Sequence, residues 1–287
     1  MEVWDYERAR RYLLAMERPQ HELANHRFWV DWNTPRFLRT LSLTPPDRAG
    51  VRCLEIGGMP FTFTLLLEKH RPSFEILSVD YYAGGRTGEK LVETVRLPEM
   101  GEEHTYETTL CDLEREPLPF ADESIDGAFC CEVLEHVTVD PVNMLVEAHR
   151  VLRPDGWFIL TTPNVARLHN VLALLHGRNV YDTYELTFGP TWRHNREYTA
   201  REVRDLLEAT GFIVEEVIVE DAHPPFYEAP VSERVIRRAF ELVYRQNYGV
   251  QMYARARRGP RRQRVYPSWL FKHEVVLPKD ASPPSRG

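Results

Sequence analysis

Residues 51–80 have the sequence VRCLEIGGMPFTFTLLLEKHRPSFEILSVD, and this stretch decides the fold. A short apolar run (51–56) is followed by two glycines, then by a segment with apolar residues at helical spacing (61–70). A second apolar run (74–80) ends in an aspartate. Apolar runs that alternate with amphipathic segments are typical of β-α-β units. The stretch therefore predicts two neighbouring parallel strands joined by a helix.

The same alternation continues through most of the chain. Thr199 and Glu202 have the spacing of a capping box, in which each residue satisfies a free backbone N–H of the other at a helix start. The Pro-Asp-Gly sequence at 154–156 predicts a turn. Strands are predicted at 105–112, 124–133, 157–162, 212–220 and 249–255, and helices at 141–152, from Thr199 to Gly211, and at 231–244.

Composition limits the class of protein. The chain has 287 residues, of which 43% are hydrophobic and 28% charged, so it is expected to be globular rather than fibrous or disordered. It has no apolar run of membrane-spanning length and a charged N-terminus, which predict no membrane span, no secretory signal and a cytoplasmic location. The four cysteines lack metal-site spacing and are expected to be buried, reduced thiols.

Charge is unevenly distributed along the chain. Residues 231–287 have a net charge of +9, whereas the rest of the chain has −16. The basic segment RARRGPRRQR (255–264) leaves a nucleic-acid partner open as an alternative, although basic tails are more often solvated. The acidic body argues against binding long duplexes, because neutralising phosphates supplies most of that affinity.

Polar residues follow three predicted strands at the edge where ligands of parallel sheets bind. Gly57 and Gly58 allow a ligand to approach the backbone closely. The number of residues between Gly57 and Asp80 is typical of the separation between such a glycine loop and an acid that binds a ribose. Asp112 is the acid at the end of the next predicted strand. The glycine pattern of dinucleotide-binding proteins, GxGxxG, is absent. The pattern therefore favours a ligand with ribose and adenine but without a pyrophosphate.

Five blocks of this sequence resemble the class I S-adenosylmethionine-dependent methyltransferases of the "VLEHV" branch, which includes ubiquinone-type and glycan O-methyltransferases. The resemblance implies an α/β, Rossmann-like fold with a seven-stranded, mostly parallel sheet in the order 3-2-1-4-5-7-6, flanked by helices. It also implies S-adenosylmethionine as cofactor. The blocks are VRCLEIGG, LSVD, LCDLEREPLPFADESIDGAFCCEVLEHV, EAHRVLRPDGWFILTTPN and RHNREYTAREVRDLLEATGF.

The predicted organisation has three parts. Residues 1–49, with helical patterns at 5–16 and 34–43, are expected to form a helical cap that covers the sheet edge or roofs the site. Residues 50–257 form the methyltransferase domain. Residues 258–287 form a basic tail. Within the domain, 163–198 is predicted to be a substrate or lid insertion and 222–248 a helical insertion.

The resemblance also assigns cofactor-binding residues. Glu55, Gly57 and Gly58 flank the methionine part of the cofactor. Asp80 and the adjacent Tyr81 hold the ribose. Asp112 and Leu113 frame the adenine. Cys131 and Glu132 border the cavity in which the methyl group is transferred. In one departure, Met59 and Phe61 stand where the family's first loop usually has glycines, which leaves a non-catalytic binding protein as an alternative.

The segment Glu132-Val133-Leu134-Glu135-His136 suggests a second function. If a helix begins near Glu132, the two carboxylates and the imidazole lie on one face. The small-RNA ribose 2′-O-methyltransferases look similar here, and this resemblance implies that His194 is a further metal ligand. The candidate metal-binding residues are then Glu132, Glu135, His136 and His194. Such ligands suit Mg²⁺ or Mn²⁺. Alternatively, the acids hold the cofactor loop and His136 is structural.

An acceptor hydroxyl needs a base or a metal ion to remove its proton. Without a metal, His194 is the first candidate for the base and His136 the second. The sequence between 163 and 198 is dense in hydrogen-bonding and aromatic groups, which suits a small polar acceptor such as a glycan. The residues predicted to contact it are Asn164, Arg167, Tyr184, Arg196 and Tyr198. RNA is the alternative acceptor.

Overall fold

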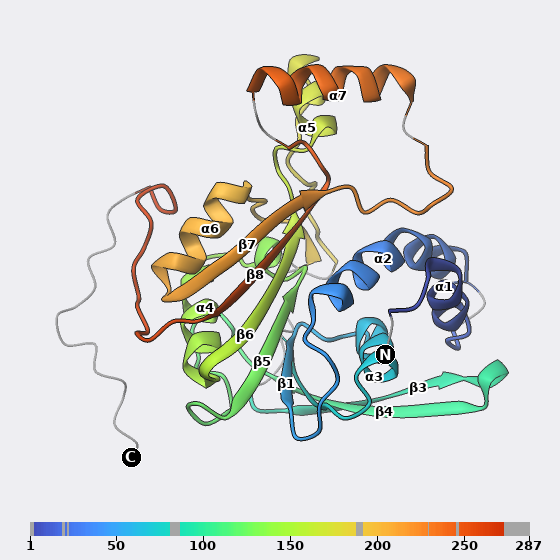
Figure 1. Cartoon of the computed structure of the whole chain (residues 1–287), viewed down its shortest axis with the longest axis vertical. Helices are drawn as coiled ribbons and strands as arrows, with labels where there is room; N and C mark the ends of the chain where they lie inside the picture. Colours follow the sequence, from blue (N-terminus) through green and yellow to red (C-terminus); the bar gives the residue numbers. More distant parts are fainter. Residues whose placement is uncertain are drawn as a thin grey trace.

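The computed structural model describes residues 3–18, 21, 23–80, 87–187, 192–228, 230–244 and 247–272, so the predicted cofactor residue Tyr81 lies outside the described residues. A sheet of eight strands forms its centre (Figure 1). The strands are β1 (Arg52–Ile56), β2 (Glu75–Asp80), β3 (Lys90–Leu97), β4 (Glu102–Leu110), β5 (Ile125–Cys131), β6 (Leu152–Pro163), β7 (Phe212–Glu220) and β8 (Gln251–Arg258). The helices are α1 (Tyr6–Leu14), α2 (Leu23–Leu43), α3 (Thr62–His70), α4 (Pro141–Val151), α5 (Leu168–Leu175), α6 (Ala200–Ala209) and α7 (Val231–Tyr244).

The strand order is β3-β4-β2-β1-β5-β6-β8-β7. From β4 to β6 the neighbouring strands are parallel, whereas β8 lies antiparallel between β6 and β7. Without β3, this arrangement is the predicted 3-2-1-4-5-7-6. The predicted number of seven strands is wrong, because β3 adds an eighth by pairing antiparallel with β4 over its full length. Its alternating apolar and polar residues give it the pattern of an edge strand.

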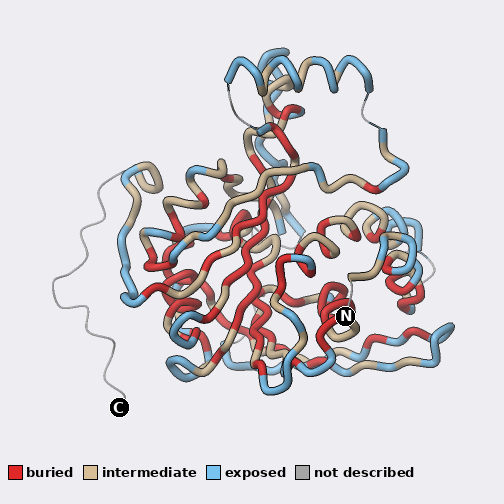
Figure 2. The backbone as a smooth tube through the Cα atoms, in the orientation of Figure 1, coloured by how far each residue is buried: buried red, intermediate tan, exposed pale blue. Residues whose placement is uncertain are grey.

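Helices cover both faces of the sheet. One buried cluster joins alternate strand residues to α4 and α6, and another joins the opposite strand faces to α1, α2 and α3. The central strands are buried along most of their length (Figure 2). Because every second side chain points to the same face, each central strand contributes to both clusters. The carboxyl ends of β1, β2 and β5 are thereby held at one edge of the sheet.

Several local predictions are confirmed. The strand at 212–220 and the helix at 231–244 have the predicted bounds. The capping box of α6 is present, with the Thr199 side chain accepting from the backbone N–H of Glu202. All four cysteines are free thiols, and three of them are buried. Among the described residues, no helix is both long enough and apolar enough to cross a membrane.

Two parts of the chain add to the core fold near the site. α2 begins at Leu23, well before the predicted helix at 34–43, and places its side chains over the carboxyl ends of the strands. α5 and α7 project from one end of the sheet (Figure 1). No residue of α7 is buried (Figure 2). α2, in contrast, also contributes Val30, Phe37 and Leu41 to the buried cluster on one face of the sheet.

Candidate active site

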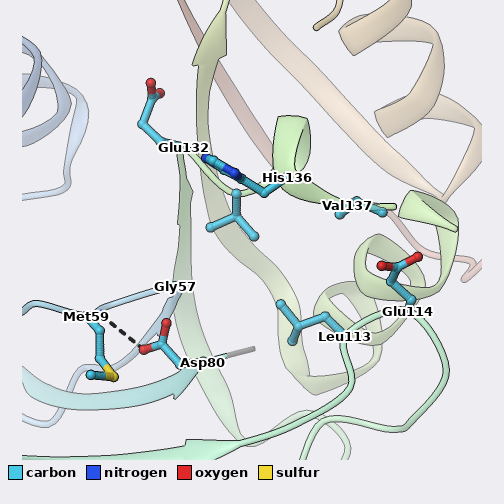
Figure 3. A pocket seen from close by; sticks show the side chains of 9 residues that line it. Gly57, Met59, Asp80, Leu113, Glu114, Glu132, His136 and Val137 are labelled. Atoms are coloured by element: carbon cyan, nitrogen blue, oxygen red, sulfur yellow. Dashed lines mark hydrogen bonds between the residues drawn. The ribbon is translucent and has the colours of Figure 1, made fainter. Parts of the chain in front are cut away.

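A first cavity, of about 160 Å³, opens where β1, β2 and β5 end (Figure 3). It is the place where ligands bind in parallel sheets. The predicted cofactor residues Gly57, Asp80, Leu113 and Glu132 all line it, together with Met59, Glu114, Val133, His136 and Val137. The structure thus brings together residues that lie up to eighty positions apart in the sequence.

Asp80 is the acid at the end of β2. Its carboxylate accepts a hydrogen bond from the backbone N–H of Met59, at 3.0 Å (Figure 3). It also accepts one from Thr108 Oγ1, at 3.3 Å. Burial raises its pKa to about 6, against the opposing effect of these hydrogen bonds. Asp80 therefore ties the first glycine loop to β2 and lines the cavity as well.

The first loop is shaped by one glycine and one unusual aromatic residue. Gly57 has φ +78°, and a Cβ placed there would lie 2.3 Å from Val133 Cγ2. Phe61 also has a left-handed backbone, but its side chain is buried and stacks on Tyr106, with ring centroids 4.9 Å apart. Phe61 therefore leaves the cavity open, although it replaces a family glycine. Of the loop residues 59–61, which differ from the family pattern, Met59 and Pro60 line a cavity.

The predicted adenine-side residues differ in their positions. Leu113 lines the first cavity, whereas Asp112 does not; its carboxylate accepts from the backbone N–H of Glu114 at 3.1 Å. Glu114 was not predicted. It lines the cavity and fixes the following loop by accepting hydrogen bonds from residues 138–140.

A second cavity, of about 240 Å³, continues from the first. Gly57, Met59, Glu132 and His136 line both of them. The predicted residues Glu55, Gly58 and Cys131 also line the second cavity. Glu55 is almost completely buried and accepts from Thr64 Oγ1 at 2.7 Å, and burial raises its pKa to about 8.

α2, part of the segment predicted to cover the sheet edge or roof the site, contributes one wall of this cavity, although none of its residues was among the predicted site residues. Trp29, Asn33, Arg36 and Phe37 line it from above the strand ends. The Arg36 guanidinium is buried and lies 4.0 Å from Glu132. No motif marks these residues, because α2 precedes the first block that resembles the family.

The chain from Glu132 to His136 does not form the predicted helix. β5 ends at Cys131, Glu132 has φ +56°, and only a single 3₁₀ turn follows, over Leu134–His136. A left-handed conformation is costly for a glutamate, and such strain is found mainly at functional sites. The turn aims Glu132 toward Thr161 and Gln251, which donate to its Oε1 at 2.8 and 2.7 Å.

Three of the four predicted metal ligands nevertheless meet. Side-chain atoms of Glu135, His136 and His194 all lie within 4.8 Å of one another, and Glu132 is not part of this group. Glu135 is fully buried; its Oε2 accepts from Thr162, whereas its Oε1 has no hydrogen-bond partner among the described residues. Burial, with the nearby Glu132, holds the pKa of Glu135 well above its usual range.

His194 is oriented by a carboxylate. Its Nδ1 lies 2.9 Å from Glu197 Oε1, and Arg167 donates to the same carboxylate through Nη2 at 3.1 Å. Burial alone would raise the pKa of Glu197, but the hydrogen bonds from His194 and Arg167 outweigh it and hold this pKa below its usual value. This geometry keeps Nε2 of the imidazole available, as a catalytic base or a metal ligand requires.

A third cavity, of about 500 Å³, lies beyond His194. It shares Asn33, Arg36, Glu132 and His194 with the second cavity, and α5, α7 and β8 close it. Glu132 lines all three cavities.

Of the residues predicted to contact the acceptor, only Arg167 lines the third cavity. Two of these predictions are corrected: Asn164 and Tyr198 are 2% and 1% exposed and belong to the framework. Tyr184 is 85% exposed, beneath the Arg193 guanidinium. Arg196 pairs with Glu202 at 2.8 Å, outside this cavity. Aromatic and polar density alone did not distinguish packing from contact.

Comparison with known proteins supports the family assignment. Residues 54–160 match the model of a family described as "Methyltransferase domain". This part of the chain is therefore similar to a methyltransferase domain. A probable S-adenosylmethionine-dependent methyltransferase of Mycolicibacterium smegmatis is 37% identical over 101 residues, which cover 35% of this chain and 34% of that protein. The chain thus spans about a third of the length of the curated relatives it matches.

Solved structures show the same fold. A methyltransferase domain from Archaeoglobus fulgidus, described as a SAM-dependent methyltransferase, has a TM-score of 0.51 and 17% identity, covering 80% of this chain and 99% of that one. A putative methyltransferase of Haloferax volcanii, solved with the Trm112 methyltransferase activator, has a TM-score of 0.50 and 17% identity, covering 80% and 90%. The chain therefore has the same fold as these methyltransferases.

Proposed function

We propose that the protein transfers a methyl group from S-adenosylmethionine to a hydroxyl of a sugar or another small polar acceptor. The observation that supports this most directly is the continuity of the three cavities, since Glu132 lines all of them and His194 lies between the second and the third. A cofactor held at the strand ends and an acceptor held under α5 and α7 would meet beside His194.

The residues fit the cofactor in shape and charge. Gly57 leaves the space that a Cβ would fill, and Asp80 and Leu113 lie where the ribose and adenine are expected. Glu132 places a carboxylate at the second cavity, which suits a cationic sulfonium. Arg36, in the same wall, would hold the carboxylate of the methionine part where the family uses glycine backbone.

When bound, S-adenosylmethionine supplies an electrophilic methyl group whose sulfur leaves as a neutral thioether. The acceptor oxygen forms the new C–O bond as the C–S bond breaks, and the hydroxyl proton passes to His194 Nε2. Glu197 stabilises the protonated imidazole and is itself held by Arg167. A positioned base contributes about 10²- to 10⁴-fold, and enclosing the reactants adds to this by fixing their approach.

A transfer assay tests the proposal. The purified protein is incubated with S-adenosylmethionine labelled in the methyl group and with panels of neutral glycosides, phenols and short RNAs, and the label is followed into product. Transfer to a glycoside or another small alcohol supports the proposal. Transfer to RNA alone, or binding of the cofactor with no transfer to any panel, contradicts it.

A divalent ion at Glu135, His136 and His194 is the second candidate for activating the hydroxyl. The observation that favours it is the buried, unpartnered Oε1 of Glu135 beside two imidazoles. One carboxylate and two imidazoles suit a transition ion such as Mn²⁺ more than Mg²⁺. Elemental analysis before and after EDTA dialysis tests it: loss of both a bound ion and activity, with recovery on adding Mn²⁺, supports the metal, whereas unchanged activity favours His194 as the base.

A further inference from the structure

The third cavity carries charge of both signs in nearly matched amounts. Its three arginines each face a carboxylate of the same wall: Arg36 lies 4.0 Å from Glu132, Arg167 donates to Glu197 at 3.1 Å, and Arg237 lies 3.6 Å from Glu233. Arg237 also pairs with Asp221. An anionic ligand bound at Arg167 or Arg237 would have to break a pair in this wall, and breaking a buried ion pair is costly. A neutral ligand can use both partners, since each pair offers donors and acceptors in fixed positions.

One side of the same cavity is aromatic. Trp32 of α2 packs edge-on against Tyr227, with ring centroids 5.4 Å apart, and against His223, at 5.6 Å. All three rings line the cavity and are only partly buried, so a ligand can reach them. Aromatic rings bind the C–H faces of ring-shaped ligands while leaving the ligand's hydroxyls free to hydrogen-bond elsewhere.

His223 adds an unused polar atom. Its Nε2 faces Asp221 at 3.9 Å, whereas its Nδ1 is buried and has no hydrogen-bond partner among the residues that the structure describes. A buried polar atom without a partner is costly unless a ligand or water satisfies it. It belongs to one of the three rings that form the aromatic wall of this cavity.

We propose that the third cavity is a binding site for an uncharged, polyhydroxylated ring, such as a neutral pyranose, that stacks on Trp32 and Tyr227. The Arg167–Glu197 and Arg237–Glu233 pairs take its hydroxyls, and one hydroxyl points to His194. This inference rests on the proposed function and narrows it, because it excludes uronic acids, sugar phosphates and polynucleotides as the preferred acceptor.

Binding is measured apart from methyl transfer. Saturation-transfer NMR and calorimetry, with S-adenosylhomocysteine present, compare methyl pyranosides of several configurations with the corresponding uronic acids and 6-phosphates. We expect saturable binding of at least one neutral pyranoside and at least about tenfold weaker binding of its charged forms. Tighter binding of the charged forms, or no binding of any neutral pyranoside, overturns the inference.

Variants locate the site. Trp32→Ala and Tyr227→Ala should each weaken pyranoside binding about tenfold, and Trp32→Phe should recover most of the loss, with cofactor affinity unchanged. Phe226→Ala is the matched control, because this neighbour of Tyr227 is 62% exposed and does not line the cavity. Equal binding by all of these variants overturns the inference.

The two hypotheses can fail separately. If neutral pyranosides bind through Trp32 and Tyr227 but no methyl group is transferred, the binding site stands and the proposed function fails. If another small alcohol is methylated while neutral pyranosides do not bind, the proposed function stands and this inference fails.

Discussion

The pair formed by His194 and Glu197 joins the second and third cavities. The imidazole is held at 2.9 Å from a carboxylate that Arg167 fixes from its other side. Among the residues predicted for catalysis, His194 is the one that borders the third cavity, whereas His136 borders the first two.

Replacing His194 should therefore affect turnover and not cofactor binding. We expect His194→Ala to lower turnover by about 10²- to 10⁴-fold, because the acceptor loses its base. Glu197→Gln keeps a hydrogen-bond acceptor but removes the charge, so its loss should be smaller. Initial rates at saturating acceptor, with cofactor affinity from calorimetry, measure both effects.

The control for that comparison is His176→Ala. His176 is exposed and its Nδ1 lies 2.7 Å from a carbonyl of its own helix, so its replacement should leave turnover unchanged. Near-normal turnover of His194→Ala would remove His194 from the base role.

Glu55 should make stability depend on pH. Its pKa is raised to about 8, so the folded chain retains a proton that the unfolded chain loses above about pH 4.5. The stabilisation is fully present below the unfolded pKa, and it is lost as pH rises through the folded one. The free energy of unfolding should fall between pH 5 and 8, by at most about 1.4 kcal/mol per pH unit for this site.

Urea unfolding at several pH values measures this dependence in the original chain and in Glu55→Gln. The variant should show a flatter profile, because an amide does not titrate. Asp80, whose pKa is raised to about 6, is present in both proteins and contributes equally. Parallel profiles would show that Glu55 is ionised throughout.

At the scale of elements, the loop after β1 packs closely against the turn after β5, where Gly57 lies next to Val133. A methyl group on Gly57 would meet Val133 Cγ2 at 2.3 Å, and its φ of +78° is unfavourable for alanine. We expect Gly57→Ala to weaken cofactor binding by about tenfold or more, and Gly57→Ala with Val133→Ala to recover part of the loss. Calorimetry measures the affinities; no recovery would assign the whole effect to backbone strain.

Helix α2 should contribute directly to cofactor affinity. Arg36→Ala is expected to weaken S-adenosylmethionine binding by about tenfold, since a charge-assisted contact to a carboxylate is lost. Binding of 5′-methylthioadenosine, which has no carboxylate, should not change. Arg39→Ala is the control, because Arg39 pairs with Glu220 and lines none of the three cavities. Equal losses for both ligands would contradict the assignment.

The sequence predicted the elements whose signals are local. β1, α3 and β2 follow from apolar periodicity, and the start of α6 follows from its capping box. The helix expected at Glu132 failed because a left-handed residue redirects the chain after β5, and no residue type at that position signals such a conformation. β3 was missed because the resemblance supplied seven strands.

The candidate site was predictable only in part, because only some of its residues lie in local sequence motifs. Asp80, Gly57 and Leu113 lie in motifs and line the first cavity as expected. Arg36 and Tyr227 come from segments without any motif, and their distance from the strand ends depends on how α2 and the loop before α7 pack. Tertiary packing of this kind leaves no periodic pattern in the sequence.

For the whole molecule, the basic segment near the C-terminus is largely paired. Arg255 binds Glu215, Arg257 binds Asp155, and Arg258 binds Glu123. These pairs hold the first part of the basic segment, which lies in β8, against acidic residues of the body.

RNA binding should accordingly be weak. We expect a fluorescently labelled single-stranded RNA to bind no more tightly than nonspecific complexes, with a dissociation constant of about 10⁻⁴ to 10⁻⁶ M at physiological salt. Fluorescence anisotropy at several salt concentrations measures this. Much tighter binding, with a steep decrease as salt rises, would favour the RNA alternative.

The extra strand β3 has a consequence for how the molecule behaves at high concentration. Without it, β4 would be the last strand, and its open backbone N–H and C=O groups would invite pairing with another copy. β3 covers that ladder, and the ion pairs Lys90–Glu107 and Arg96–Glu103 join β3 to β4. Trimming the hairpin to imitate seven-stranded relatives would thus give a protein prone to precipitate, even with its catalytic centre untouched.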